Sequence, residues 1–129
     1  ELYGTGRVLV MDDEEQVREI IGEMLTHLGY EGSFAKEGGE ALEKYKQAMI
    51  KGQPFDAVII DLTIPGGMGG KETVTKLLQI DPDVKAIVAS GYSNDPVMAE
   101  FTLHGFKGVA TKPFVVKQLS RVLHETIAT

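Results

Sequence analysis

Five polar residues of this chain follow directly on short, largely apolar runs, and their types suit phosphoryl chemistry. They are Asp12, Asp13, Asp61, Ser90 and Lys112. The runs that precede them span residues 8–11, 57–60, 86–89 and 109–111. Carboxylates bind hard cations or act as nucleophiles, and a hydroxyl and an ammonium can stabilise phosphoryl oxygens. The pattern indicates a phosphoryl site if the fold brings these residues together.

Segments with helical spacing of apolar residues separate these runs. The spacing predicts helices over residues 14–28 and 71–80, around residues 41–49, from residue 96 to near 105, and from 115 or 116 to 127. Strands are expected at residues 7–11, 33–35, 57–60, 85–89 and 108–111. Five strand–helix units predict one doubly wound α/β domain. We expect a five-stranded parallel sheet in the flavodoxin-like order 2-1-3-4-5, with helices on both faces.

The predicted sheet brings the candidate residues to one edge, because parallel strands share the direction in which they end. Asp12, Asp13 and Asp61 then form a cluster whose like charges need a cation, and carboxylate oxygens suit Mg²⁺. Asp61 ends the central strand and is the best candidate for a phosphorylated nucleophile. Lys112 and Ser90 would contact the phosphoryl oxygens. The acids could instead cap the following helix, through Asp13 or Glu14.

Composition narrows the class of protein. The chain has 129 residues, is 43% hydrophobic and carries 13 basic and 19 acidic residues, for a formal charge of −6. It has no cysteine, which excludes disulfides and thiolate sites. No basic stripe indicates direct nucleic-acid binding, and no apolar stretch reaches the roughly 20 residues of a membrane span. The start of the chain lacks the parts of a signal peptide, so we expect a cytoplasmic domain without membrane contact.

Two common phosphate-binding motifs are absent. Glycines precede Lys71, but Pro65 stands where a P-loop has its first glycine, and Glu72 stands where it has Ser or Thr. The first strand leads into acidic residues rather than into the glycine-rich turn of a dinucleotide-binding fold. The carboxylate cluster is therefore the better candidate site.

In combination these residues resemble the receiver domain of two-component response regulators, over the whole chain. The matching residues are Asp12, Asp13, Asp61 with Pro65 and Gly69, Ser90, and Lys112 with Pro113 and Phe114. The resemblance implies that Asp61 accepts a phosphoryl group from a phosphohistidine of a histidine kinase core or a histidine phosphotransfer domain. It also implies that Asp13, Asp61 and the backbone carbonyl of Thr63 bind Mg²⁺, with Asp12 acting through water, and that the Lys112–Pro113 bond is cis.

The resemblance also predicts the bounds of the domain and the kind of protein to which it belongs. Residues 1–6 are expected to be a lead-in or linker and residues 7–129 the receiver domain. Segments such as residues 90–99 and 105–108 are similar to receivers fused to bacterial hybrid sensor histidine kinases. The chain departs from the family at Val109, where an aromatic residue usually reports phosphorylation. A β-branched side chain is stiff and cannot swing as a ring does.

Two other functions stay open on the sequence alone. A Mg²⁺-dependent phosphatase of the haloacid-dehalogenase type also phosphorylates an aspartate, but it has a second Asp two residues later, where this chain has Thr63. A degenerate receiver would act only as an interaction module. A receiver catalyses only its own phosphorylation and dephosphorylation, whereas a hybrid parent chain would be a kinase.

Overall fold

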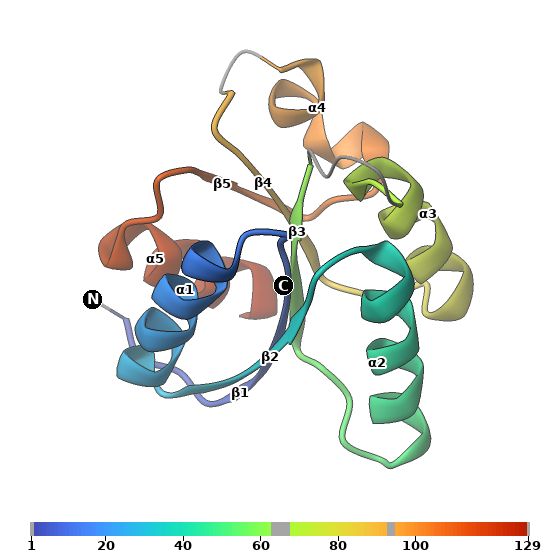
Figure 1. The fold of residues 1–129 in the computed structure, drawn as a ribbon, viewed down its shortest axis with the longest axis horizontal. Helices are drawn as coiled ribbons and strands as arrows, with labels where there is room; N and C mark the ends of the chain where they lie inside the picture. Colours follow the sequence, from blue (N-terminus) through green and yellow to red (C-terminus); the bar gives the residue numbers. More distant parts are fainter. Residues whose placement is uncertain (1, 63–67, 93–94, 129) are drawn as a thin grey trace.

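The computed structural model describes residues 2–62, 68–92 and 95–128, in which a parallel sheet is covered on both faces (Figure 1). Its strand order is β2-β1-β3-β4-β5, as predicted. The strands are β1 (Gly6–Met11), β2 (Tyr30–Ala35), β3 (Ala57–Asp61), β4 (Ala86–Ser90) and β5 (Gly108–Thr111). β3 and β4 are buried along their whole length, which explains why both read as continuous apolar runs.

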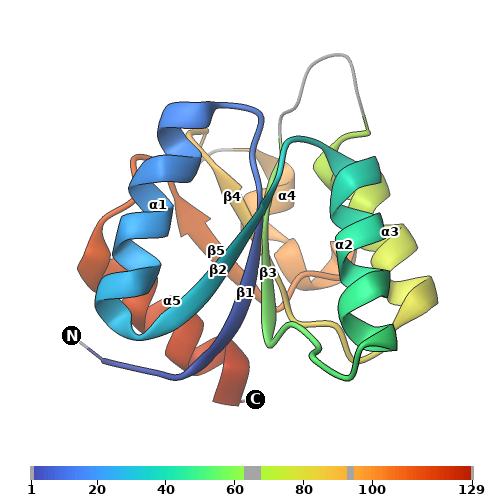
Figure 2. The ribbon, with the colours of Figure 1, turned by 60° about the horizontal axis from the view of Figure 1, so that its bottom comes forward.

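Helices α1 and α5 cover one face of the sheet, whereas α2, α3 and α4 cover the other (Figures 1 and 2). The helices are α1 (Glu15–Leu28), α2 (Gly38–Ile50), α3 (Gly70–Ile80), α4 (Pro96–Ala99), the 3₁₀ helix η1 (Phe101–His104) and α5 (Val116–Ala128). Each helix layer packs one apolar core against the sheet, around Ile21 and Leu123 on the first face and around Leu77 and Phe106 on the second. This is the doubly wound architecture that the sequence predicts.

Two elements differ from the prediction. β2 starts at Tyr30 rather than at residue 33. Gly29 adopts a left-handed conformation with φ 102°, so the chain turns from α1 directly into the strand. A Cβ at Gly29 would strike the backbone oxygen of Gly4. The sequence hides the strand start because Glu31 and Gly32 interrupt its apolar pattern.

The expected fourth helix is also shorter. α4 ends at Ala99, where Glu100 leaves helical geometry with φ −117° and ψ 42°, and η1 follows. The tighter 3₁₀ turn leaves Leu103 77% exposed while Phe101 packs on the core. The predicted start at residue 96 is confirmed, since Pro96 occupies the first turn and Asp95 caps the helix by accepting a hydrogen bond from the Val97 N–H (2.9 Å).

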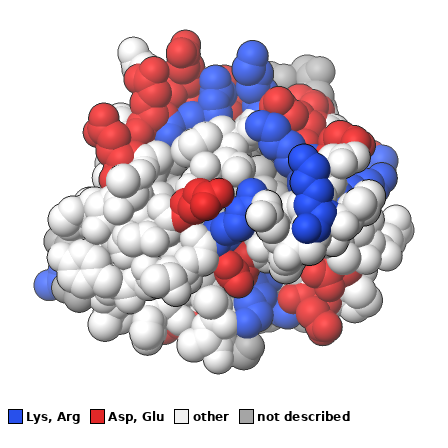
Figure 3. All heavy atoms as spheres, turned by 90° about the horizontal axis from the view of Figure 1, so that it is seen from below, with Lys and Arg blue, Asp and Glu red and all other residues white. Residues whose placement is uncertain are grey.

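The end of the molecule opposite the acidic cluster shows acidic and basic side chains intermingled rather than gathered by sign (Figure 3).

Within the described ranges, every helix is too short or too polar to cross a membrane.

Candidate metal and phosphoryl site at the carboxyl edge of the sheet

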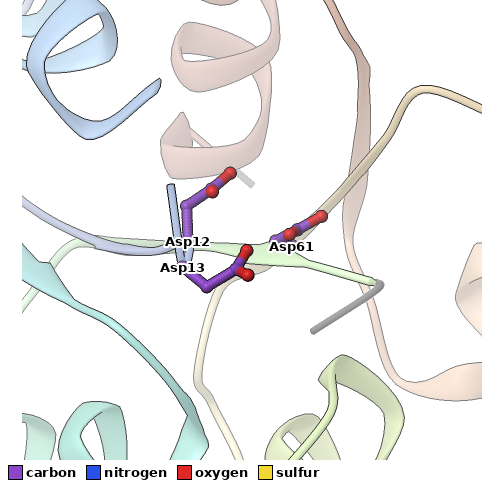
Figure 4. A group of neighbouring side chains, drawn as sticks. All are labelled: Asp12, Asp13 and Asp61. Carbon is purple, nitrogen blue, oxygen red and sulfur yellow. The ribbon is translucent and has the colours of Figure 1, made fainter. Parts of the chain in front are cut away.

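The predicted carboxylates come together at the carboxyl ends of β1 and β3 (Figure 4). One oxygen from each of Asp12, Asp13 and Asp61 lies within 4.8 Å of the other two. Register explains this arrangement, because Met11 pairs with Ile60 and the following residue of each strand is an aspartate. Asp12 and Asp61 are 2% and 5% exposed, whereas Asp13 is exposed to solvent. The cluster therefore has two buried carboxylates and one open to solvent.

Lys112 joins the two buried carboxylates. Its Nζ donates to Asp12 Oδ2 at 2.6 Å and lies 3.3 Å from Asp61 Oδ1. Burial alone would lower the pKa of Lys112, but the hydrogen bond to Asp12 and the charges of Asp61 and Asp12 outweigh it and raise this pKa. The ammonium is thus held charged between two carboxylates. The Lys112–Pro113 bond is cis, as the resemblance implies.

Both carboxylate oxygens of Asp12, its backbone N–H and its carbonyl make hydrogen bonds. Its Oδ1 accepts a hydrogen bond from the backbone N–H of Glu14 (2.9 Å), and its backbone N–H donates one to the Ala35 carbonyl (3.0 Å). Its carbonyl accepts from Arg18 Nη1 at 2.8 Å. Glu14 is the N-cap of α1 but makes no side-chain cap bond. The hypothesis of capping by Glu14 is therefore wrong, and Asp12 supplies the local turn instead.

Ser90 ends β4, beside the acidic cluster. Because Asp61 pairs with Ala89, Ser90 lies one residue beyond Asp61 on the neighbouring strand. It is 2% exposed, and its Oγ accepts from the backbone N–H of Tyr92 at 3.0 Å. Its carbonyl accepts from the Lys112 N–H at 3.0 Å. Thr63, whose carbonyl is the fourth expected metal ligand, lies outside the described residues.

Val109 lies at the position where the sequence departs from the family pattern. It is partly buried and packs against the core on the face of the sheet that α2, α3 and α4 cover. Phe101, Val109 and Val122 line part of a groove of about 440 Å³ between η1 and α5. A ring at position 109 would occupy space that this chain leaves open beside Val109.

The donor set fits a hard divalent cation. Carboxylate oxygens from two adjacent strands converge, and the exposed Asp13 leaves the cluster open to solvent. Mg²⁺ prefers one or two carboxylates with its remaining positions filled by water or phosphate oxygens, so a fully enclosed cage is not needed. Two carboxylates already share one ammonium, which leaves the cluster with a net negative charge. The described residues therefore fit Mg²⁺.

Two glycines hold the start of α3 close to Asp61. A Cβ at Gly70 would lie 2.9 Å from the carbonyl oxygen of Asp61. Gly38, at the start of α2, donates its N–H to the Met68 carbonyl at 3.3 Å, and a Cβ there would lie 2.8 Å from Met68 Cβ. The buried Thr73 closes this contact by donating to the Gly69 carbonyl at 2.7 Å. The segment 68–70 is thus clamped between α2 and the end of β3.

Gly38→Ala is expected to destabilise the protein by about 1–3 kcal/mol, because its methyl group would overpack this clamp. Gly39→Ala is the matched control, since the nearest atoms to a Cβ there are the carboxylate oxygens of the partly exposed Glu37, at 3.1 Å. Alanine favours a helix over glycine, so the control should change stability by less than about 1 kcal/mol. Urea denaturation of both variants measures the difference, and equal losses would contradict the clamp.

Arg18 is the site residue that sequence reasoning missed. Its guanidinium holds the Asp12 carbonyl from one turn into α1. The available signal was its position six residues after Asp12, on a helix that starts at the site. The spacing of residues along a helix does not show whether a long side chain folds back toward the N-terminus of that helix. The contact between Arg18 and Asp12 could therefore be found only in the structure.

Comparison with known proteins places these features in a family. The sequence model of the response regulator receiver domain matches residues 8–124. The chemotaxis protein CheY of Thermotoga maritima is 36% identical over 121 residues, which cover 90% of this chain and 96% of that protein. The sensor kinase CckA of Brucella abortus is 32% identical over 98% of this chain, which spans 13% of that kinase. A crystal structure of Vibrio cholerae CheY4 is similar, with a TM-score of 0.83, 26% identity and coverage of 95% of this chain and 99% of that one.

Proposed function

Because this chain belongs to the response regulator receiver domain family, we propose that it accepts a phosphoryl group on Asp61 in a Mg²⁺-dependent reaction. The observation that carries this proposal is the position of Lys112, whose ammonium bridges buried Asp12 and Asp61 beside the exposed Asp13. One acid at a strand end is commonly structural, but this arrangement supplies a nucleophile, a cation-binding pair and a cation for phosphoryl oxygens.

The proposed step is a direct displacement. An oxygen of the Asp61 carboxylate attacks the phosphorus of a phosphohistidine, the P–N bond breaks, and the imidazole leaves with its electron pair and is protonated. The Lys112 ammonium moves from Asp61 Oδ1, 3.3 Å away, to an oxygen of the transferred group. Asp13, Asp61 and the Thr63 carbonyl would hold Mg²⁺, with Asp12 acting through water, and the ion would neutralise charge on the phosphoryl oxygens.

Ser90 supplies the proposed conformational response. Its hydroxyl contacts the Tyr92 N–H, and a move toward the phosphoryl group would exchange that contact for one with a phosphoryl oxygen. Phosphorylation shifts the population toward the state in which Ser90 and Lys112 both bind the group, because only differential affinity moves an equilibrium. With Val109 in place of an aromatic residue, the α4–β5–α5 surface must report this shift without a rotating ring.

An apolar surface beside the site suits the proposed phosphodonor. Val17 and Ile20 of α1, with Pro113 and Phe114, line a groove of about 370 Å³ that includes Lys112. Ile20 is 50% exposed. A helix that carries a phosphohistidine could bury its apolar face here with the imidazole above Asp61. We propose a histidine kinase core or a histidine phosphotransfer domain as this partner, in the cytoplasm, with no contact of this domain to membrane or nucleic acid.

The parent protein is also a proposal. The match to the sensor kinase CckA over 98% of this chain supports a receiver within a bacterial hybrid histidine kinase. The match to a CheY over nearly its full length supports a separate response regulator equally well. The division into a lead-in of residues 1–6 and a domain of residues 7–129 stays a prediction.

The test is intact mass spectrometry after incubation with acetyl phosphate, with Mg²⁺ or with EDTA. We expect one phosphoryl adduct on the wild type with Mg²⁺, and none with EDTA or in Asp61→Asn. Asp83→Asn is the control, because it removes an exposed carboxylate from the turn before β4 and should keep the adduct. A folded wild type that binds Mg²⁺ could gain no adduct from acetyl phosphate and none from a phosphohistidine donor. That result would favour an interaction module that is not phosphorylated.

A further inference from the structure

Another groove lies between α1 and the outer strand β2, on the other side of α1 from the apolar surface of residues 17 and 20. Figure 2 shows α1 beside β2 at this edge of the sheet. It measures about 880 Å³. Its lining residues are Glu15, Arg18, Glu19, Gly22, Glu23, Thr26, His27, Gly32 and Phe34. β2 pairs with β1 alone among the described strands, so the groove runs along the open edge of the sheet.

The floor of this groove is apolar because two glycines leave it open. The Phe34 ring lies across Gly22 and Gly32, and a Cβ at either glycine would come within 3.0 or 3.1 Å of Phe34 Cζ. Phe34 is itself only partly buried, with its inner side packed on the core beneath α1. A partner side chain can therefore reach an aromatic surface between the helix and the strand.

The rim of the groove is acidic. Glu15, Glu19 and Glu23 follow one another at intervals of four residues on α1, so they form one row about 12 Å long. All three are exposed, and no ion pair is found for them within the described parts of the chain. Arg18 also lines the groove, but its Nη1 donates to the Asp12 carbonyl, and no ion pair with the three glutamates is found among the described residues. Three carboxylates against one guanidinium leave the rim with a net negative charge.

We propose that this acidic groove binds a basic segment of a protein partner, with an apolar side chain against Phe34 and lysines or arginines facing the three glutamates. Complementary charge gives such a contact its specificity and association rate, whereas the apolar anchor contributes binding energy. The row begins three residues after Asp12, and the groove is also lined by Arg18, which holds the Asp12 carbonyl. An occupant would therefore touch the helix that starts at the acidic site. This surface is separate from the apolar groove proposed for the phosphodonor.

The test uses a short synthetic peptide of lysine, leucine and alanine, titrated into the ¹⁵N-labelled 129-residue chain. We expect amide shifts confined to α1 and β2 and an affinity that falls as salt is added. The double variant Glu19→Lys/Glu23→Lys should bind about tenfold more weakly, a loss of about 1.4 kcal/mol. Glu43→Lys/Glu100→Lys changes the net charge equally on other faces and should bind as the wild type does.

Other outcomes would overturn the proposal. Equal weakening in both double variants would show attraction to net charge alone, and shifts on other elements would place the peptide elsewhere. Sedimentation that shows a dimer lost in Glu19→Lys/Glu23→Lys would assign the groove to a second copy of this chain. Asp61→Asn should bind the peptide unchanged, so failure of the phosphotransfer proposal and failure of this one are separate results.

Discussion

Lys112→Met is expected to destabilise the metal-free protein by about 2–3 kcal/mol at neutral pH. Lys112 is the cation that contacts both Asp12 and Asp61, whose side chains are 3% and 6% exposed. Removing one partner of a buried ion pair commonly costs 3–5 kcal/mol, and the 18% exposure of the Lys112 side chain places this case below that range. Methionine keeps most of the length and volume, so the loss reports charge rather than packing.

The pH dependence of this loss follows from the raised pKa of Lys112. A group with a raised pKa in the folded state contributes its full stability below its ordinary value, here 10.5, and loses it as the pH rises through the folded value. The difference between wild type and Lys112→Met should therefore be constant from about pH 6 to 9 and shrink only above about pH 10.5.

Urea denaturation across this pH range, with EDTA present, measures the effect. Lys107→Met is the control, because Lys107 is exposed and, among the described residues, the one hydrogen bond of its Nζ is to the Asp83 carbonyl, at 3.5 Å. It should change stability by less than about 0.5 kcal/mol. Added Mg²⁺ should reduce the deficit of Lys112→Met by restoring a positive charge among the carboxylates. A deficit that Mg²⁺ leaves untouched would contradict the electrostatic explanation.

The position of the carboxylates could be predicted from sequence because few facts determine it. Once the apolar runs 8–11 and 57–60 are neighbouring parallel strands, the residues that follow them must meet at one edge. The structure confirms that prediction through the pairing of Met11 with Ile60. The same reasoning placed Ser90 beside Asp61, because β4 pairs with β3 in an equally simple register.

What the sequence could not determine depends on flexible side chains and short segments. Lys112 lies nearer to Asp12 than to Asp61, a choice among rotamers of a long side chain that spacing does not encode. The division of residues 96–104 into α4 and η1 depends on the backbone of Glu100, within a segment too short to show periodicity. The acidic groove beside Phe34 requires two glycines far apart in sequence, at positions 22 and 32, to face one ring.

Asp13→Asn is expected to change stability in opposite directions with and without Mg²⁺. In EDTA the variant should be more stable than the wild type by about 0.5–1 kcal/mol, because one of three carboxylates within 4.8 Å loses its charge. Asp13 is the exposed member and no described hydrogen bond requires its carboxylate, so little is lost in exchange. Buried Asp12 does not offer this test, since its carboxylate binds Lys112 and the Glu14 N–H.

With Mg²⁺ at about one hundred times its dissociation constant, the wild type should gain about 2.7 kcal/mol by linkage. Asp13→Asn should gain much less, because an amide oxygen is a weaker ligand than a carboxylate for a hard cation, and the order of stability should reverse. Thermal denaturation with EDTA and across a Mg²⁺ series measures both halves, with Asp83→Asn as the control. A variant that gains as much from Mg²⁺ as the wild type would remove Asp13 from the metal site. Loss of stability in EDTA would instead show that its carboxylate supports the fold, so the two measurements separate a ligand from a structural residue.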